Sequence, residues 1–473
     1  MKSRTDSLRP LLTATLEHSL KYLDSLDDQP VAGTKPAAEL RQALSRPLAQ
    51  QGIAPEQIIE ELVNDTNGGL HAIGGGRFFA WVNGGTLPAA LAADWLTSAW
   101  DQNAAMFAVG PSAAIVEEIV GEWLKDLLGL PATASFALVT GSQMAHVTCL
   151  AAARNALLAR QGWNAIEKGL FGAPALRLLC SQARHGSIER AVAMLGMGVG
   201  NLEPLATDTS GRVEPEALER ALRSSPGAPA IICLQAGDIN TGAYDRFQEL
   251  IPIARRYNTW IHIDGAIGLW AAASPKYSSL MRGAAQADSW TTDGHKWLNT
   301  PYDCGYAFVA DAQAHRAAFT LQASYLVHAT DARDQMDWNP EWSRRARGFA
   351  TYAALRQLGR SGVAELVERC CDRATSIVTH IGQLPGVEVL AMPIINQGLV
   401  RFLSSKPGAA DGDHDRHTDA VITAIRNDGV AFFTGTKWHG QRAMRISVSG
   451  WKTSEEDVER VVESVKRVLQ RLT

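Results

Sequence analysis

The middle of the chain alternates short apolar runs with helical patterns, and this alternation constrains the fold more than any other feature. The apolar runs lie at 175–181 (ALRLLCS), 228–236 (APAIICLQA), 260–264 (WIHID), 287–292 (ADSWTT) and 304–310 (CGYAFVA). Helical patterns lie between or before them at 141–160, 186–197 and 246–257. Strands with continuous apolar runs, alternating with helices, form mostly parallel sheets that helices cover on both faces. The sequence therefore predicts an α/β fold with a mostly parallel central sheet.

The two ends of the chain differ from this middle part. Helical apolar spacing dominates the first 70 or so residues, and a chain of 473 residues has room for about two to four domains. Beyond about residue 360, short strand patterns appear at 386–392, 398–403, 430–435 and 443–449. In the last helix, Thr453 and Glu456 predict a capping box. We predict an N-terminal helical, dimer-forming segment at 1–90, a large α/β domain at 91–360 and a smaller α+β domain at 361–473.

Composition argues against several classes of function. The net charge of −4 opposes non-specific nucleic-acid binding. No apolar run is long enough for a transmembrane helix, and the first 20 residues lack a secretory signal. The six cysteines show no metal-ligand spacing and fit reduced thiols in a cytoplasmic protein. His414 and His417 lie in the stretch 408–417, which is expected to be a solvated loop, and no metal site is predicted.

Several polar residues directly follow the apolar runs. Ligands of open α/β sheets bind at the carboxyl ends of the strands, so these residues are candidates for one site. Gly141, Ser142 and Gln143 open a helix, whose free N–H groups favour a phosphate, although Ser142 also suits a simple cap. Asp264 suits either a structural pair or a cationic ring nitrogen. His185 is either a structural residue or a partner for the face of a planar cofactor.

Lys296 lies in the stretch 288–299 (DSWTTDGHKWLN), where an apolar run has just ended. A lysine amine in an apolar pocket becomes nucleophilic and forms an imine with an aldehyde. A phosphate cradle, a stacking histidine, a carboxylate for a pyridine nitrogen and a lysine are the parts that pyridoxal 5'-phosphate (PLP) requires. Each is a weak indication alone, but together they predict PLP as the cofactor.

Four segments carry a resemblance to a known family. They are 293–305 (DGHKWLNTPYDCG), 262–271 (HIDGAIGLWA), 78–96 (FFAWVNGGTLPAALAADWL) and 323–328 (ASYLVH). Through them the chain, from about residue 60 to its end, resembles the group II PLP-dependent amino-acid decarboxylases, which include aromatic-amino-acid, histidine and glutamate decarboxylases. The resemblance implies fold type I of PLP enzymes and an intertwined homodimer whose active sites lie at the subunit interface.

The resemblance also assigns roles to single residues. Lys296 is expected to hold the cofactor as an imine and Asp264 to pair with its pyridinium nitrogen. Tyr325, 29 residues after Lys296, stands at the position of the family's loop tyrosine and is the expected proton donor. Asp293 stands where many relatives carry Asn, and we expect it to bond the backbone or His295. The other expected cofactor contacts are Gly141, Ser142, Gln143, His185, Thr241, Ala266 and His295.

The expected reaction is decarboxylation of an L-amino acid to the amine and CO2, with an aromatic substrate favoured. The predicted substrate residues are Phe79, Trp81, Asn83 and Arg445, with Phe78 and Trp438 as further aromatic walls. The aromatic side chains equally suit domain packing. Arg445 equally suits an aminotransferase or a structural ion pair, so transamination and retro-aldol cleavage stay open as alternatives. A third alternative is that the chain binds PLP without catalysing a reaction.

Overall fold

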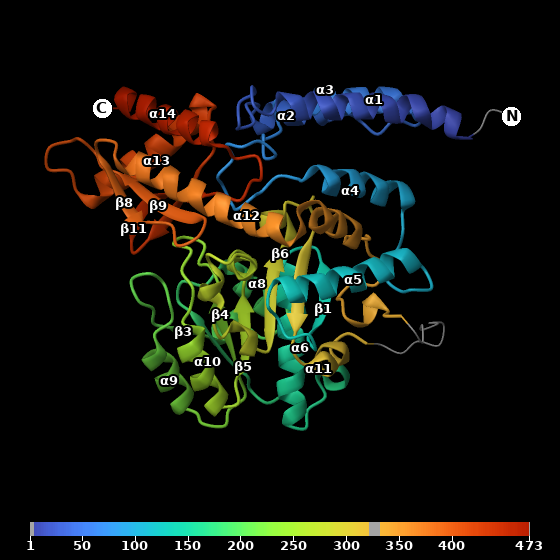
Figure 1. Cartoon of the computed structure of the whole chain (residues 1–473), viewed down its shortest axis with the longest axis vertical. Coiled ribbons are helices and arrows are strands. Elements are labelled where there is room, and N and C mark those ends of the chain that lie inside the picture. The colour runs from blue at the N-terminus through green and yellow to red at the C-terminus, as the bar shows by residue number, and fades with distance from the viewer. Residues whose placement is uncertain (1–3, 321–331, 473) are drawn as a thin grey trace.

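The computed structural model describes residues 4–320 and 332–472, so Tyr325 lies outside the described residues. A seven-stranded sheet forms the centre, in the order β1-β7-β6-β5-β4-β2-β3 (Figure 1). Strands β6, β5, β4, β2 and β3 run parallel to one another, whereas β7 is antiparallel to both of its neighbours. The predicted mostly parallel sheet is thus confirmed. Its strands are β1 Ser135–Val139, β2 Arg177–Ser181, β3 Leu202–Leu205, β4 Ala230–Gln235, β5 Trp260–Asp264, β6 Ser289–Asp293 and β7 Gly305–Val309.

Helices cover both faces of this sheet because alternate strand residues point to opposite sides. On one face, Leu178 and Cys180 of β2 pack in a core cluster with helices α6 and α8. On the other face, Leu179 of the same strand packs in a cluster with α5, α9, α10 and α12. The helices of this part of the chain are α4 Pro88–Trp100, α5 Pro111–Leu127, α6 Ser142–Arg160, α7 Ala165–Lys168, α8 Gly186–Met194, α9 Pro215–Arg223, α10 Phe247–Arg256, α11 Ala312–Ala317 and α12 Gly348–Gly382.

The N-terminal helices and the C-terminal part of the chain lie at the same end of the molecule, away from the large sheet, with the two termini on opposite sides (Figure 1). The N-terminal part contributes α1 Arg4–Ser25, α2 Ala37–Leu44 and α3 Pro55–Thr66. The C-terminal part has a four-stranded antiparallel sheet in the order β10-β11-β9-β8, with two helices packed beside it. Its elements are β8 Val387–Ala391, β9 Gln397–Phe402, α13 Asp411–Asp428, β10 Thr434–Trp438, β11 Gln441–Ser447 and α14 Glu455–Leu472.

Some local predictions differ from the structure. The stretch 408–417 is not a loop throughout, because α13 begins at Asp411. The last helix is capped one residue later than predicted: Ser454 and Asp457 exchange the capping bonds, while Thr453 Oγ donates to Gly76 O over 2.9 Å. Residue 360, the predicted domain boundary, lies inside α12, whose helical geometry is interrupted at Gly359 (φ 61°).

Candidate active site

A cavity of about 510 Å³ lies at the carboxyl edge of the large sheet, where the parallel strands end. Its volume is typical of a site for a small ligand or cofactor. Eight of the predicted cofactor residues line it: Gly141, Ser142, Gln143, His185, Asp264, Ala266, His295 and Lys296. Residues from β2, β4, β5 and β6 converge here because the ends of parallel strands meet at one edge.

Lys296 sits on a single π-helical turn, Gly294–Leu298, that follows β6. Its Nζ lies 3.3 Å from Asp293 Oδ2, and its side chain is 15% exposed. Asn299, in the left-handed region at φ 51°, ends the turn. Its amide donates to Lys296 O over 2.9 Å and to Ser449 O over 2.9 Å, and its Oδ1 accepts from Trp451 N over 2.8 Å.

The segment before α4 closes over this turn from the other side. Leu87 N donates to Asn299 O over 2.8 Å. Gly84 is packed so closely that a Cβ there would collide with Lys296 O and the Asn299 amide. Glycine is therefore required at this close approach, and the turn that carries Lys296 is held by two distant parts of the chain, 84–87 and 449–451.

The N-terminus of α6 provides an anion-binding end to the cavity. Gly141, Ser142 and Gln143 form its N-cap and first turn and line the cavity, and the helix dipole favours negative charge there. Within the described residues, Gln143 Nε2 and His295 Nδ1 are buried and lack a hydrogen-bond partner. Orphaned donors beside a helix N-terminus fit a phosphate group.

Asp293 partly occupies this end of the cavity. Its Oδ1 accepts from Ser142 N over 2.9 Å, and its Oδ2 accepts from Ser142 Oγ over 2.6 Å. The same carboxylate lies 3.6 Å from His295 Nδ1. Asp293 bonds the backbone and approaches His295, as expected from the sequence. It also engages Ser142, a residue expected to serve a phosphate.

Asp264 ends β5 and lines the same cavity. Its Oδ1 accepts from Ala266 N over 3.1 Å, and its Oδ2 lies 3.5 Å from His146 Nε2. Burial alone would raise the pKa of Asp264, but His146, His185 and the Ala266 N–H hold that pKa well below its usual range. Asp264 is thus a buried carboxylate that stays ionised, which fits a cationic ring nitrogen.

His185 and Ala266 also line the cavity. His185 is the N-cap of α8, and its Nδ1 accepts from Ser187 N over 3.2 Å. This bond fixes the ring at the cavity wall. The cavity therefore combines an anion-binding end, a carboxylate, an amine and a flanking imidazole, and the residue set fits PLP.

Thr241 and Arg445 are among the predicted residues that do not line the cavity. Thr241 is held in a tight turn, where its Oγ1 donates to Ser210 O over 2.9 Å and its N donates to Asp238 Oδ1 over 2.9 Å. Arg445, on β11, is buried, and burial lowers its pKa while the nearby Asp238 opposes that effect. Thr241 is thus held within the large domain, while Arg445 of the C-terminal sheet lies near Asp238 of the large domain.

The predicted aromatic substrate residues are not gathered in one pocket. Phe79 is buried in the core and stacks on Phe433, with ring centroids 5.3 Å apart. The backbone at Trp81 and Val82 is left-handed (φ 51° and 60°), which leaves Trp81 53% exposed and Val82 buried. Trp438 is buried beside Leu399 and Ala443. These rings pack between segments hundreds of residues apart, which periodicity alone does not show.

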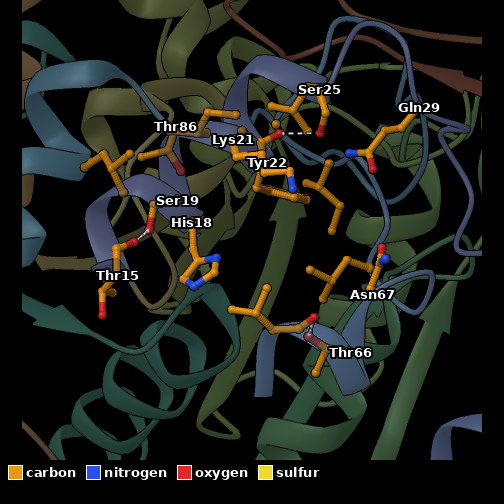
Figure 2. Close-up of a pocket in the computed structure, with 18 of the residues that line it drawn as sticks. Thr15, His18, Ser19, Lys21, Tyr22, Ser25, Gln29, Thr66, Asn67 and Thr86 are labelled. Atoms are coloured by element: carbon orange, nitrogen blue, oxygen red, sulfur yellow. Dashed lines mark hydrogen bonds between the residues drawn. The ribbon is translucent and has the colours of Figure 1, made fainter. Parts of the chain in front are cut away.

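Asn83 lines a second, larger cavity of about 910 Å³. Figure 2 shows its wall, to which α1 contributes Thr15, His18, Ser19 and Tyr22, and α3 contributes Thr66. His295 and Tyr302 line both cavities. The ring of Tyr302 lies 4.1 Å from that of His295, and its hydroxyl donates to Asn83 Oδ1. The larger cavity and the Lys296 site therefore share a wall at His295 and Tyr302.

The sequence analysis missed Tyr302, His146 and His262. Tyr302 lies six residues after Lys296, within the segment 293–305 that carries the family resemblance, but no role was predicted for it. His146 lies four residues after Ser142 on α6, so the two share a helix face. His262 lies two residues before Asp264 on β5, so both point to one face of the sheet. The spacing of His146 from Ser142 and of His262 from Asp264 was the sequence signal that could have indicated these two histidines.

The chain is similar to proteins of known activity over most of its length. The family described as "Pyridoxal-dependent decarboxylase conserved domain" matches residues 38–404. An aromatic-L-amino-acid decarboxylase from Bacillus atrophaeus is 24% identical, covering 99% of this chain and 96% of the relative. A 4-hydroxyphenylacetaldehyde synthase from Rhodiola rosea is 24% identical, covering 96% and 93%. The crystal structure of Oryza sativa TDC with PLP and tryptamine has the same fold, with a TM-score of 0.92 over 100% of both chains at 21% identity.

Proposed function

Because the chain belongs to the family of pyridoxal-dependent decarboxylases, we propose that it converts an aromatic L-amino acid into the corresponding amine and CO2. The protein is a carboxy-lyase, and its cofactor is PLP. The observation that carries the proposal is the single cavity that unites Lys296, Asp264 and the N-terminus of α6.

Each wall of the cavity has a proposed part in holding the cofactor. The first turn of α6, with Gln143 and His295, would hold the phosphate through N–H donors. Asp264 would hold a proton on the pyridine nitrogen, since its carboxylate is buried and ionised. Lys296 would bond to the aldehyde carbon through its Nζ. His185 and Ala266 would lie against the two faces of the ring.

PLP, when bound, supplies a conjugated ring that accepts the electron pair of the bond that breaks at Cα. The chain's residues decide which bond that is and where the proton goes. The substrate carboxylate must lie where few polar groups solvate it, because loss of solvation favours departure of CO2. We propose that Tyr325, which lies outside the described residues, delivers a proton to Cα, with His185 in support.

An aromatic substrate is supported by the junction of the two cavities. The flat ring of Tyr302 lies there, and Leu91 and Trp95 add apolar surface to the larger cavity. The Bacillus atrophaeus relative is named for aromatic amino acids, which agrees with this choice. Arg445 lies outside both cavities, so the structure offers no support for the aminotransferase alternative that depended on it.

We also propose a homodimer and a cytoplasmic location. Leu8, Leu12, Leu16 and Leu20 repeat every four residues on α1 and are all exposed, which leaves an apolar stripe for a second copy of the chain to cover. The six cysteines are buried and free, which is usual in a reducing compartment. Among the helices that the structure describes, none is long and apolar enough to cross a membrane.

A product screen tests the function. The purified, PLP-loaded protein is incubated with each common amino acid, and amines, aldehydes and keto acids are scored by mass spectrometry. We expect an amine from an aromatic substrate, and Tyr325→Phe should lose the amine or divert to an aldehyde while still binding PLP. A keto acid, or amine from a non-aromatic substrate alone, would overturn the proposal. Unchanged amine formation in Tyr325→Phe would remove only the role of Tyr325.

The carboxylate of Asp293 gives a second prediction. Because it takes the N–H and hydroxyl of Ser142 and repels a phosphate, Asp293→Asn is expected to bind PLP about three- to tenfold more tightly, measured by titrating the apoenzyme. Asp311→Asn is the matched control, because Asp311 caps α11 and Asn is an equally good cap. Equal or weaker PLP binding by Asp293→Asn would contradict the prediction.

A further inference from the structure

A buried hydrogen-bonded chain lies behind Asp264, on the side away from the cofactor cavity. His146 Nε2 is 3.5 Å from Asp264 Oδ2, and His146 Nδ1 is 2.9 Å from His262 Nε2. His262 Nδ1 is 2.9 Å from Ser289 Oγ, which accepts from Trp260 Nε1 over 3.0 Å. The two histidines are fully buried, and their rings meet edge to face. None of His146, His262 and Ser289 lines the cavity.

The groups at the two ends of this chain, the Asp264 carboxylate and the Trp260 indole N–H, determine which atom donates and which accepts in each hydrogen bond. An ionised Asp264 only accepts, so His146 Nε2 must carry a hydrogen that faces it. In a neutral His146, Nδ1 is then an acceptor, and the 2.9 Å contact requires His262 Nε2 to donate. His262 Nδ1 in turn accepts from the Ser289 hydroxyl, whose oxygen receives the indole N–H of Trp260. In this arrangement each contact from Ser289 to His146 joins one donor to one acceptor.

Two further observations agree with this direction. Thr291 Oγ1 lies 3.4 Å from His146 Nδ1, where its hydroxyl can add a second donor to that acceptor. Burial lowers the pKa of His262 to about 3, so its ring carries no charge near neutral pH. The carboxylate of Asp264 faces His146 Nε2 at 3.5 Å and receives the Ala266 N–H over 3.1 Å.

We propose that Ser289, His262 and His146 form a one-way hydrogen-bond relay that orients Asp264, keeps it ionised and thereby sets the protonation of the PLP ring nitrogen. The three are positioning residues, since they act through Asp264, and the inference rests on the proposed role of Asp264. The relay replaces water, which would otherwise stabilise the carboxylate, by donors fixed on α6, β5 and β6.

The test measures the ring nitrogen directly. Holoenzyme is reconstituted with PLP labelled with ¹⁵N in the ring, and the nitrogen signal is recorded by NMR. In His146→Leu the signal should move toward that of an unprotonated pyridine, with PLP binding weaker by about tenfold, because a bond to a charged group is lost. His146→Gln should restore the wild-type signal, since its amide can donate to Asp264 and its oxygen can accept from His262.

Ser289→Ala provides a milder variant in case His146→Leu does not fold. It removes the far donor and should shift the signal in the same direction by a smaller amount. His315→Leu is the matched control, because His315 is fully buried and hydrogen-bonded to Ser135 and Trp338 but does not line the cavity. Its nitrogen signal should equal that of the wild type.

A comparison with Asp264→Asn separates the two levels of the inference. If Asp264→Asn moves the nitrogen signal while His146→Leu and Ser289→Ala leave it unchanged, the relay is wrong and the role of Asp264 stands. If Asp264→Asn also leaves the signal unchanged, both the relay and the proposed role of Asp264 are overturned.

Discussion

Lys296→Ala is expected to lower the rate of amine formation by about a thousandfold or more, because positioned proton transfer alone is worth about 10²–10⁴-fold and the nucleophile is lost as well. The variant should also lose the covalent attachment of PLP. Treatment of the wild-type holoenzyme with borohydride, followed by peptide mapping, should place the reduced cofactor on residue 296. The same procedure on Lys296→Ala should yield no labelled peptide.

The control for this experiment is Lys452→Ala. Lys452 lines only the larger cavity, near the ring of Trp451, and has no proposed part in the chemistry. It should keep both the adduct at residue 296 and PLP binding. If Lys296→Ala retained a full stoichiometry of reducible PLP, another amine would be the attachment site, and the proposed role of Lys296 would be lost.

Asp264→Asn is the second change with a large expected effect. The substitution keeps the shape of the side chain but removes the negative charge that would hold a proton on the pyridine nitrogen. Because a hydrogen bond to a charged group is worth about 1.5–3 kcal/mol, we expect PLP to bind about ten- to a hundredfold more weakly. Amine formation should fall by at least as much. Titration of the apoenzyme with PLP and steady-state kinetics measure the two effects.

Asp245→Asn is the matched control for the loss of a buried carboxylate. Asp245 accepts from Val213 N and Gln235 N, and burial raises its pKa to about 6. It does not line the cavity, so its variant should be less stable but bind PLP as the wild type does. A fully active Asp264→Asn with normal PLP affinity would reject the role of Asp264.

The sequence was informative where local pattern determines structure. Apolar runs and helical spacing predicted the sheet and its covering helices, and the position of Asp264 and Lys296 at the ends of such runs predicted that they share an edge. Strands β1 and β3 were not predicted; the segment of β3, LEPL, contains Glu and Pro and is not a continuous apolar run. The capping box was misplaced by one residue because Thr453 and Ser454 are adjacent and equally suitable caps.

The sequence was uninformative where distant segments meet. Phe79 read as a substrate-facing aromatic residue, but its partner Phe433 is more than 350 positions away, and no local pattern indicates that contact. Arg445 and Thr241 were predicted as ligand contacts, but neither lines the cavity: Thr241 bonds Ser210 and Asp238, and Arg445 lies near Asp238. His146 and His262 were overlooked because each lies in an apolar element, where a lone histidine reads as a core residue.

The bonds that Asn299 makes to residues 449 and 451 have a consequence for the biosynthesis of the protein. Asn299 bonds the backbone at Ser449 and Trp451, positions that the ribosome adds about 150 residues after the lysine itself. A nascent chain that has already exposed Lys296 therefore still lacks the partners that shape its turn. The turn that carries Lys296 therefore gains these bonds only when translation is nearly complete.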